Sequence, residues 1–264
     1  MAVGYEKISF EVRDGVGHLT LNRPDAANAL DLQLVQELLE VAHRCDEDAE
    51  VRAVLLTGAG RMFCAGGDLR AFAAAEEGIP AFVKQVAGTL HESLSILARM
   101  DAPIVAAVNG MAAGAGLSLV CHADLAIAAE SAKFAMAYTA AGLTPDGSST
   151  WFLERLIGRR RTLELMLTNR RLSAAEALEW NLVNRVVPDA DLMSEAGELA
   201  GRLATGPTRA YGGVKKLLIA SGTNDLETQM DLETKFIVDM AGSPDGVEGI
   251  DAFLNKRAQA FTGK

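Results

Sequence analysis

Cysteines are scarce in the sequence, and their spacing excludes two common uses of thiols. Cys45, Cys64 and Cys121 are odd in number and widely separated among the 264 residues. Such a set supplies neither a disulfide framework nor a paired metal-binding motif. We therefore expect reduced thiols in packed interiors and no metal site. Three histidines also show no metal-binding spacing with carboxylates or thiols and are interpreted as structural: His18, His43 and His122.

Positive charge and long apolar runs are lacking as well. The chain has 25 lysines and arginines and 35 aspartates and glutamates, which gives a formal net charge of -10. Because such a chain repels nucleic acids and anionic membranes, we expect neither as a partner. No apolar run is long enough to span a bilayer, and the segment from Met1 to Lys7 lacks the features of a leader. We expect a cytoplasmic protein that binds any anionic ligand through local basic residues.

Hydrophobic residues are plentiful, at 49% of the chain, and are sufficient for a substantial core. Ile8 to Arg13 and Val16 to Leu21 flank Asp14-Gly15, a pattern typical of an antiparallel hairpin. Asp31 is a plausible N-cap, and the apolar residues after it recur at helical spacing. The chain therefore begins with a small sheet followed by an amphipathic helix.

Strands that end in glycine-rich turns recur in the middle of the chain. Short buried strands are predicted at Val51 to Thr57, Ile104 to Val108 and Asp124 to Ala129, and helical segments follow the first two turns. One of these helices runs from about Ala81 to Met100. Such strand-turn-helix units predict an α/β spiral or layered fold. Beyond about Ser173 the pattern is helical, apart from one short strand at 183–187.

Two segments combine small residues with the start of a helix: Phe63 to Leu69 and Asn109 to Leu117. Backbone N–H groups at such positions have no helical partner, and small side chains let a ligand approach them. Tight turns alone would explain either segment taken separately. A dinucleotide fingerprint fails because Leu119 occupies the third glycine position. Backbone N–H groups from these two segments could bind one oxygen atom from two sides.

Several motifs, in this order and spacing, resemble the enoyl-CoA hydratase/isomerase (crotonase) family across nearly the whole chain. They are Asn22-Arg23-Pro24 with Asn28-Ala29-Leu30, Phe63 to Leu69, Pro103 to Gly110 with Gly114-Ala115-Gly116, Leu172 to Ala177, and Ala252-Phe253-Leu254 with Lys256-Arg257. The resemblance implies a crotonase (ClpP-like) α/β fold with a ββα spiral core over residues 1–205. It also implies a C-terminal α-helical oligomerisation region over residues 206–264.

The same resemblance implies that the N–H groups of Gly67 and Ala115 form an oxyanion hole around a thioester carbonyl. Donors preorganised there stabilise the negative charge that develops when the neighbouring carbon loses a proton, and each contributes about 3 kcal/mol. In the family's hydratases two glutamates activate water, and these fall at Ser118 and Tyr138 here. Neither side chain is a carboxylate base, which disfavours simple hydration.

A carboxylate is present instead at Asp146, within Gly142 to Gly147. Taken alone, Pro-Asp-Gly is typical of a turn. With Trp151, however, this stretch resembles the phenylacetate-pathway enoyl-CoA isomerase branch, whose matching aspartate is the acid/base. The implied reaction removes a C2 proton from a 3-enoyl-CoA and returns it at C4. It requires no metal and no cofactor beyond the coenzyme A of the substrate.

Three alternatives remain at the level of the sequence, and the first is an enoyl-CoA hydratase-like enzyme of the same family. In the similar 4-chlorobenzoyl-CoA dehalogenases the nucleophilic aspartate also falls at Asp146 and the assisting histidine at His91, but their tryptophan is replaced by Tyr138. Periodicity favours a partly exposed helix residue at His91, which remains a possible site residue. The alternative of another class is a non-catalytic acyl-CoA-binding homologue, because the fold alone does not guarantee activity.

Coenzyme A contacts follow from the resemblance alone. Arg23 is expected near the nucleotide, the Ala65 backbone at the adenine, and Phe253 with Lys256 reaching in from a neighbouring subunit. Trimers, or dimers of trimers, are implied, with an acyl-CoA thioester as the small-molecule partner. The remaining residues assigned to substrate binding are Asp68, Leu69 and Tyr138.

Overall fold

Six strands form the larger of two sheets in the computed structural model, which describes residues 4–264. Their order is β1-β2-β3-β5-β7-β10. β1 and β2 are antiparallel, and all other neighbours are parallel. Every position of β3 and β5 is buried, as expected for parallel strands covered on both faces. The strands are β1 (Ile8–Arg13), β2 (Val16–Leu21), β3 (Ala53–Gly58), β5 (Ile104–Val108), β7 (Leu125–Ala129) and β10 (Arg185–Val187).

The smaller sheet explains why the fold is a spiral. Its order is β4-β6-β8-β9, with β9 antiparallel to its neighbour. β4, β6 and β8 each directly follow a strand of the larger sheet, so every turn of the chain passes from one sheet to the other. This arrangement confirms the predicted α/β spiral core. The strands are β4 (Met62–Cys64), β6 (Met111–Ala113), β8 (Lys133–Ala135) and β9 (Leu172–Ser173).

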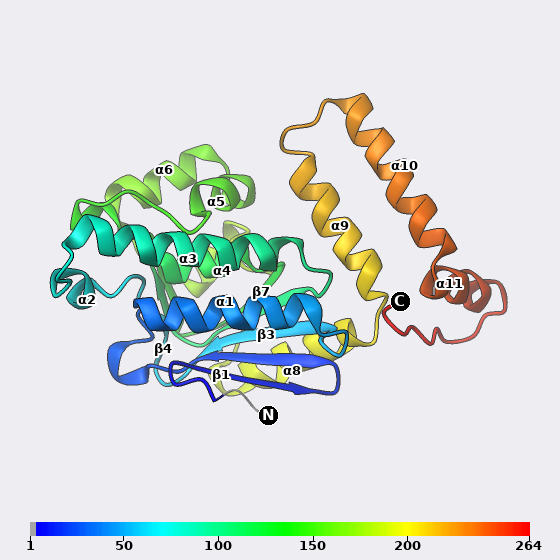
Figure 1. Cartoon of the computed structure of the whole chain (residues 1–264), viewed down its shortest axis with the longest axis horizontal. Helices are drawn as coiled ribbons and strands as arrows, with labels where there is room; N and C mark the ends of the chain where they lie inside the picture. The colour runs from blue at the N-terminus through cyan, green and yellow to red at the C-terminus, as the bar shows by residue number, and fades with distance from the viewer. Residues whose placement is uncertain (1–3) are drawn as a thin grey trace.

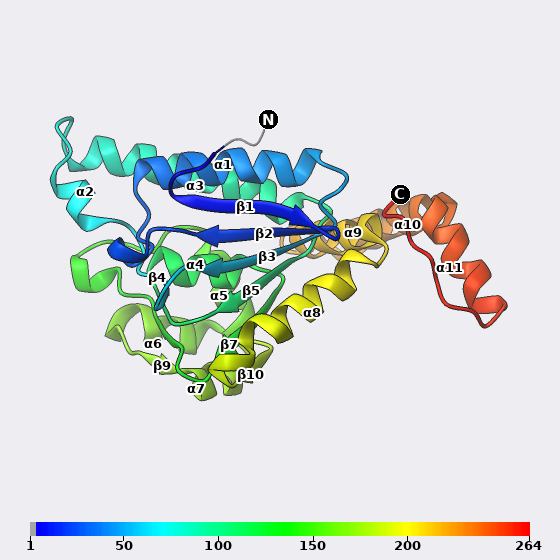
Figure 2. The ribbon, with the colours of Figure 1, turned by 90° about the horizontal axis from the view of Figure 1, so that it is seen from below.

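Helices cover both faces of the larger sheet (Figures 1 and 2). α1 (Leu32–Glu47) and α3 (Ile79–Arg99) pack against each other, and α8 (Leu192–Ala204) contacts β3, β5 and β7. The predicted N-cap is confirmed, since the Asp31 carboxylate accepts a hydrogen bond from the Leu34 N–H at 2.8 Å. The other core helices are α2 (Leu69–Ala73), α4 (Ala115–His122), α5 (Ser149–Ile157), α6 (Arg159–Thr168) and α7 (Ala174–Glu179), with short turns η1 (Pro24–Ala26), η2 (Thr139–Ala141) and η3 (Asp189–Asp191).

The C-terminal helices project from this core (Figures 1 and 2). They are α9 (Thr208–Ala220), α10 (Leu226–Gly242) and α11 (Pro244–Leu254). The expected boundary at 205/206 lies in the connection between α8 and α9, and the division into two units stays a prediction. α10 contains no buried residue, and large apolar side chains are exposed along this region: Leu226, Met230, Ile237, Val238, Val247, Ile250, Phe253 and Leu254.

A buried lysine joins α9 to the core. The Lys215 ammonium group lies 3.0 Å from the Asp124 carboxylate and donates hydrogen bonds to the carbonyl oxygens of Leu97 and Ala102. Burial lowers the pKa of Lys215, and the negative charge of Asp124 opposes this shift. Because the ammonium has a carboxylate and two carbonyls as partners, it can stay charged at the start of β5. α9 is therefore held to the end of α3 by a specific polar contact.

The three thiols are packed inside the protein, as predicted. Cys45, Cys64 and Cys121 are buried and free, and burial raises the pKa of each to about 12. They are therefore protonated at neutral pH and poor nucleophiles. Within residues 4–264, no cluster of three or more histidine, cysteine or acidic residues could hold a metal ion. None of the helices in that same range is both long and apolar enough to cross a membrane.

Candidate active site

Two backbone N–H groups lie where the chain leaves the smaller sheet. After β4, the Leu30 N–H donates to the Gly66 carbonyl at 2.8 Å, and the Asp68 N–H donates to the Leu30 carbonyl at 2.9 Å. These bonds lie on either side of the Gly67 N–H and leave it without a backbone acceptor among the described residues. Ala115 is the first residue of α4, so its N–H has no partner within the helix.

The two loops that carry these N–H groups are in contact. A Cβ atom at Gly66 would lie 3.3 Å from the Ala115 nitrogen and 2.9 Å from the Ala113 carbonyl oxygen. A Cβ atom at Gly116 would lie only 2.2 Å from the Cys64 carbonyl oxygen. The first turn of α4 therefore rests directly on the backbone of β4. The fold brings the Gly67 and Ala115 segments together, as an oxyanion hole requires.

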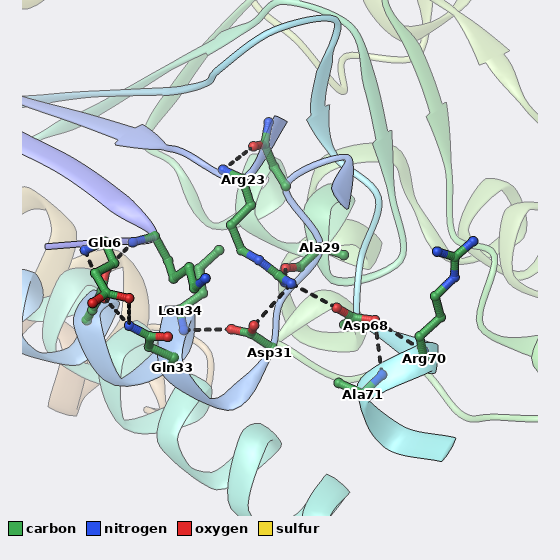
Figure 3. A network of polar contacts seen from close by, with 12 residues as sticks. Glu6, Arg23, Ala29, Asp31, Gln33, Leu34, Asp68, Arg70 and Ala71 are labelled. Atoms are coloured by element: carbon green, nitrogen blue, oxygen red, sulfur yellow. Dashed lines mark hydrogen bonds and ion pairs between the residues drawn. The ribbon is translucent and has the colours of Figure 1, made fainter. Parts of the chain in front are cut away.

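Arg23 is engaged by two carboxylates beside this loop (Figure 3). Its guanidinium lies 3.1 Å from both the Asp31 and the Asp68 carboxylates and also donates to the Ala29 carbonyl. Asp68 in addition caps α2 by accepting from the Arg70 and Ala71 N–H groups. Burial alone would raise the pKa of Asp68, but these N–H donors and Arg23 lower it below its ordinary value. The network fixes the loop that presents the Gly67 N–H.

Asp146 lies between two side chains from other elements. Its Oδ1 accepts a hydrogen bond from the Tyr138 hydroxyl at 2.6 Å, and its Oδ2 lies 3.8 Å from His91 Nε2 on α3. The Asp146 side chain is 32% exposed and that of His91 50% exposed, so both can be reached from solvent. Helical periodicity showed only that His91 is on an exposed helix face. The tertiary structure places it beside the carboxylate.

The backbone around Asp146 is fixed by hydroxyl and imidazole groups. The Asp146 carbonyl accepts from Ser149 Oγ at 2.8 Å and from Ser118 Oγ at 3.0 Å. The Gly147 N–H donates to His91 Nε2 at 3.1 Å. This bond uses the lone pair of Nε2, so the proton of the neutral imidazole is on Nδ1. Asp146 is therefore presented by an anchored turn.

Tyr138 links the carboxylate to the oxyanion loop. A Cβ atom at Gly114 would lie 3.9 Å from Tyr138 Cε2, so the ring packs beside the residue that precedes Ala115. Ser118, on α4, lies 3.1 Å from the Tyr138 hydroxyl. Burial and the nearby negative charge of Asp146 raise the pKa of Tyr138, which stays protonated at neutral pH. Ser118 and Tyr138, at the positions of the hydratase glutamates, both contact Asp146.

His122 is a buried neighbour of the same turn. The residue is 7% exposed, and its Nδ1 lies 3.4 Å from Ser148 Oγ. Burial, assisted by the positive charge of Lys215, lowers the pKa of His122 to about 3. His122 is therefore neutral at physiological pH, in keeping with its interpretation as structural. A cavity of about 590 Å³ adjoins this region and is lined by residues that include His91, His122, Ser148, Trp151 and Phe152.

The remaining predicted binding residues are spread over the molecule. The Ala65 N–H donates to the Ala27 carbonyl, and Leu69 is 51% exposed at the start of α2. Phe253 is 78% exposed on α11, and Lys256 follows the end of that helix. α2 and α11 lie at opposite ends of the molecule (Figure 2). One chain therefore does not bring Phe253 and Lys256 to its own Gly67, and their predicted contact from a neighbouring subunit stays a prediction.

Comparisons with known proteins agree with this architecture. A family model described as enoyl-CoA hydratase/isomerase matches residues 11–264. The 1,2-epoxyphenylacetyl-CoA isomerase of Escherichia coli (strain K12) is 42% identical over 260 residues, which are 98% of this chain and 99% of that protein. The 4-chlorobenzoyl coenzyme A dehalogenase-2 of Arthrobacter sp. is 38% identical over 255 residues, which are 96% of this chain and 92% of that protein.

Solved structures give the same result. The crystal structure of enoyl-CoA hydratase from Bacillus anthracis has a TM-score of 0.91 at 34% identity, with 98% of this chain and 100% of that chain covered. The ββα spiral and these relatives define an acyl-CoA enzyme of the enoyl-CoA hydratase/isomerase kind. The chain belongs to the enoyl-CoA hydratase/isomerase (crotonase) family, as its motifs predicted.

Proposed function

We propose that the protein is an enoyl-CoA isomerase in which Asp146 moves a proton between two carbons of the acyl group. The observation that carries this proposal is the position of Asp146, which is linked through Tyr138 to the loop that carries Ala115. A base at this place and donors for the thioester oxygen are the two components that enolate chemistry requires.

The reaction follows from these groups. The ionised Asp146 removes a C2 proton from a 3-enoyl-CoA, and the electron pair delocalises into a dienolate. The N–H groups of Gly67 and Ala115 hydrogen-bond the enolate oxygen. The protonated Asp146 then returns the proton at C4, the double bond lies between C2 and C3, and the carboxylate is regenerated. Because the exchange is a net isomerisation, we propose that no cofactor is needed beyond the coenzyme A of the substrate.

The related proteins support an acyl-CoA substrate and an isomerase reaction. The Escherichia coli relative is an isomerase of a phenylacetyl-CoA derivative by its name, and its identity to this chain is 42%. Hydration is disfavoured because Ser118 and Tyr138 offer hydroxyl groups at the positions of the two hydratase glutamates. A non-catalytic homologue is disfavoured because Asp146 is accessible and contacts two other polar side chains.

Dehalogenase-like chemistry is the second candidate because His91 lies beside Asp146. In that reaction the aspartate attacks an aryl carbon, and the histidine activates water. Here the His91 Nε2 lone pair accepts the Gly147 N–H, and Tyr138 donates to Oδ1 of the carboxylate. The first bond would have to break before His91 could act as a base through Nε2, and the second before Oδ1 could attack as a nucleophile. They therefore favour proton transfer by Asp146 over nucleophilic attack.

The contacts to coenzyme A remain part of the proposal. Arg23 is already neutralised by Asp31 and Asp68, so a phosphate would have to share its guanidinium. The exposed Lys256 has no such partner in the described part of the chain, and we propose that it reaches the nucleotide of a neighbouring subunit. This arrangement fits the proposed trimer or dimer of trimers.

Removal of the Asp146 charge tests the proposed reaction. We expect Asp146→Asn to lower kcat for 3-enoyl-CoA isomerisation by about 10²- to 10⁴-fold, since the amide cannot accept the proton. Turnover of 3-enoyl-CoA, 2-enoyl-CoA and 4-chlorobenzoyl-CoA would be measured in parallel on wild type and variant. Asp46→Asn, which changes an exposed aspartate at the end of α1, is the matched control and should behave as wild type.

The substrate panel separates the candidates. Wild-type activity in the Asp146→Asn variant would refute the role of this aspartate. Release of chloride from 4-chlorobenzoyl-CoA would favour the dehalogenase reaction. Hydration of 2-enoyl-CoA as the only activity would show that a water-activating group other than the two usual glutamates operates here.

A further inference from the structure

The Tyr138 hydroxyl occupies one oxygen of the proposed base. Tyr138 lies 2.6 Å from Asp146 Oδ1, whereas among residues 4–264 the Oδ2 atom has only His91 Nε2 nearby, at 3.8 Å and beyond hydrogen-bond distance. Building on the proposed function, we propose that Tyr138 is a positioning residue. Its hydroxyl fixes Asp146 so that Oδ2 alone carries the proton, and it stabilises the ionised carboxylate between turnovers.

The direction of the hydrogen bonds supports this role. An ionised carboxylate only accepts hydrogen bonds, so the single phenol hydrogen of Tyr138 is donated to Oδ1. The Ser118 hydroxyl can then donate to the Tyr138 oxygen at 3.1 Å, to the Asp146 carbonyl at 3.0 Å or to the Gly114 carbonyl at 3.3 Å. The first two of these bonds hold the pair together from α4. A bond of this kind, to a charged group at short distance, is stronger than a bond between neutral groups.

The position of the Tyr138 ring adds a second constraint. The ring packs beside Gly114, one residue before the Ala115 donor, while its hydroxyl contacts the base. A single side chain thus sets the distance between the oxyanion loop and the carboxylate. Rate constants for proton transfer depend steeply on such distances, so fixing both groups from one residue favours the reactive geometry.

Few other groups of the described residues share the carboxylate with this hydroxyl. Two titratable groups face it: Tyr138 from the segment before η2 and His91 from α3. α4 contributes Ser118, and His122 lies behind Ser148. His91 Nε2 accepts from the Gly147 N–H and lies 3.8 Å from Oδ2. Tyr138 is therefore the main hydrogen-bond donor to the Asp146 carboxylate.

The experiment replaces only the hydroxyl group. Tyr138→Phe keeps the ring beside Gly114 and removes the donor to Oδ1. We expect the Asp146 carboxylate to lose its fixed orientation, because the hydrogen bond to Oδ1 is lost. The ¹³C chemical shift of this carboxylate, assigned with Asp146→Asn, reports the loss of the bond without substrate. For 3-enoyl-CoA, kcat should fall by about 10-fold or more while KM changes little, because the base is no longer held in the reactive geometry.

Tyr211→Phe is the matched control because it removes a phenol hydroxyl from α9, outside the site. It should leave the Asp146 carboxylate resonance and kcat unchanged. An unchanged resonance and an unchanged kcat in a folded Tyr138→Phe protein would refute the positioning role. If Asp146→Asn remains fully active while Tyr138→Phe still moves the carboxylate resonance, the proposed reaction fails but the Tyr138 to Asp146 contact stands.

Discussion

At the residue scale, single polar side chains hold backbone segments that secondary structure leaves unpaired. Asn28 is fully buried, and its amide donates to the carbonyl oxygens of Ala59, Met62 and Phe63. Its Oδ1 accepts the Arg23 N–H at 2.9 Å. The Asn28 side chain therefore holds the turn before β4 in place, although the backbone of that turn makes few hydrogen bonds to a neighbouring strand. Such side chains connect the motif around Arg23 with the loop that presents Gly67.

His122 should make stability depend on pH. Its pKa is about 3 in the folded protein and near 6.5 when unfolded, so between these values only the unfolded chain binds the proton. The contribution of His122 to the free energy of unfolding is therefore complete above pH 6.5 and is lost as the pH falls toward 3. The loss amounts to about 1.4 kcal/mol per pH unit.

Urea unfolding at pH 5 and pH 7 checks this expectation. His122→Gln should reduce the difference in unfolding free energy between the two pH values. His43→Gln, on the exposed face of α1, should leave that difference as in wild type. Equal pH dependence in wild type and His122→Gln would contradict the buried neutral state of His122.

At the element scale, the approach of α4 to β4 decides where the Ala115 N–H points. Gly116 makes this approach possible because it has no Cβ atom to meet the Cys64 carbonyl oxygen. The start of α4 is thereby placed beside the Gly66-Gly67 turn. β4 and α4 are short elements, and close packing of their backbones holds the proposed oxyanion donors in place.

Gly116→Ala should therefore damage the site more than the fold around it. The added methyl group would lie 2.2 Å from the Cys64 carbonyl oxygen, so α4 has to move and the Ala115 N–H moves with it. We expect kcat for the proposed isomerisation to fall by about 10²-fold, as for other displacements of about 1 Å. Steady-state kinetics, with circular dichroism to verify folding, measure the effect.

Gly197→Ala is the matched control for this substitution. Gly197 also lies in a helix, α8, but a Cβ atom there meets nothing within 4 Å. This variant should keep wild-type kcat and gain slightly in stability, because alanine is the better helix former. Wild-type kcat in Gly116→Ala would show that the contact between α4 and β4 does not set the position of the donor.

At the scale of the whole molecule, the C-terminal helices expose several large apolar side chains. Ile237 and Val238 on α10 are 70% and 67% exposed, and Phe253 and Leu254 on α11 are 78% and 72% exposed. Exposed apolar side chains gathered on one region are typical of an interface between proteins. It supports the proposed oligomer.

Ile237→Asp should weaken assembly. A charge in an apolar interface has to be desolvated without a partner, so we expect a shift from three or six copies toward the 27.9 kDa single chain. Light scattering coupled to size-exclusion chromatography measures the mass. Leu167→Asp on α6 is the control, because Leu167 is 68% exposed against 70% for Ile237. A monomeric wild type would refute the proposed assembly.

The sequence by itself determined the elements whose signals are local. The hairpin at Ile8–Arg13 and Val16–Leu21 and the strand at Ile104–Val108 have the predicted bounds, because apolar patterning and turn residues act over neighbouring positions. The predicted strand at 51–57 is found at Ala53–Gly58, and the predicted helix from about Ala81 to Met100 is found at Ile79–Arg99. Boundaries shift because end residues depend on caps and on packing.

Only the tertiary structure decided what depends on distant partners. The three-residue strands β4, β6 and β8 are too short for a periodic signal and exist because they pair with one another. Likewise, Tyr138 and Asp146 share one segment but His91 comes from α3, and only the fold brings His91 beside the carboxylate. The motifs around Gly67 and Ala115 indicated the two donors. Their contact required α4 to pack on β4, because hydrogen bonds and close approach depend on distances that a linear pattern does not contain.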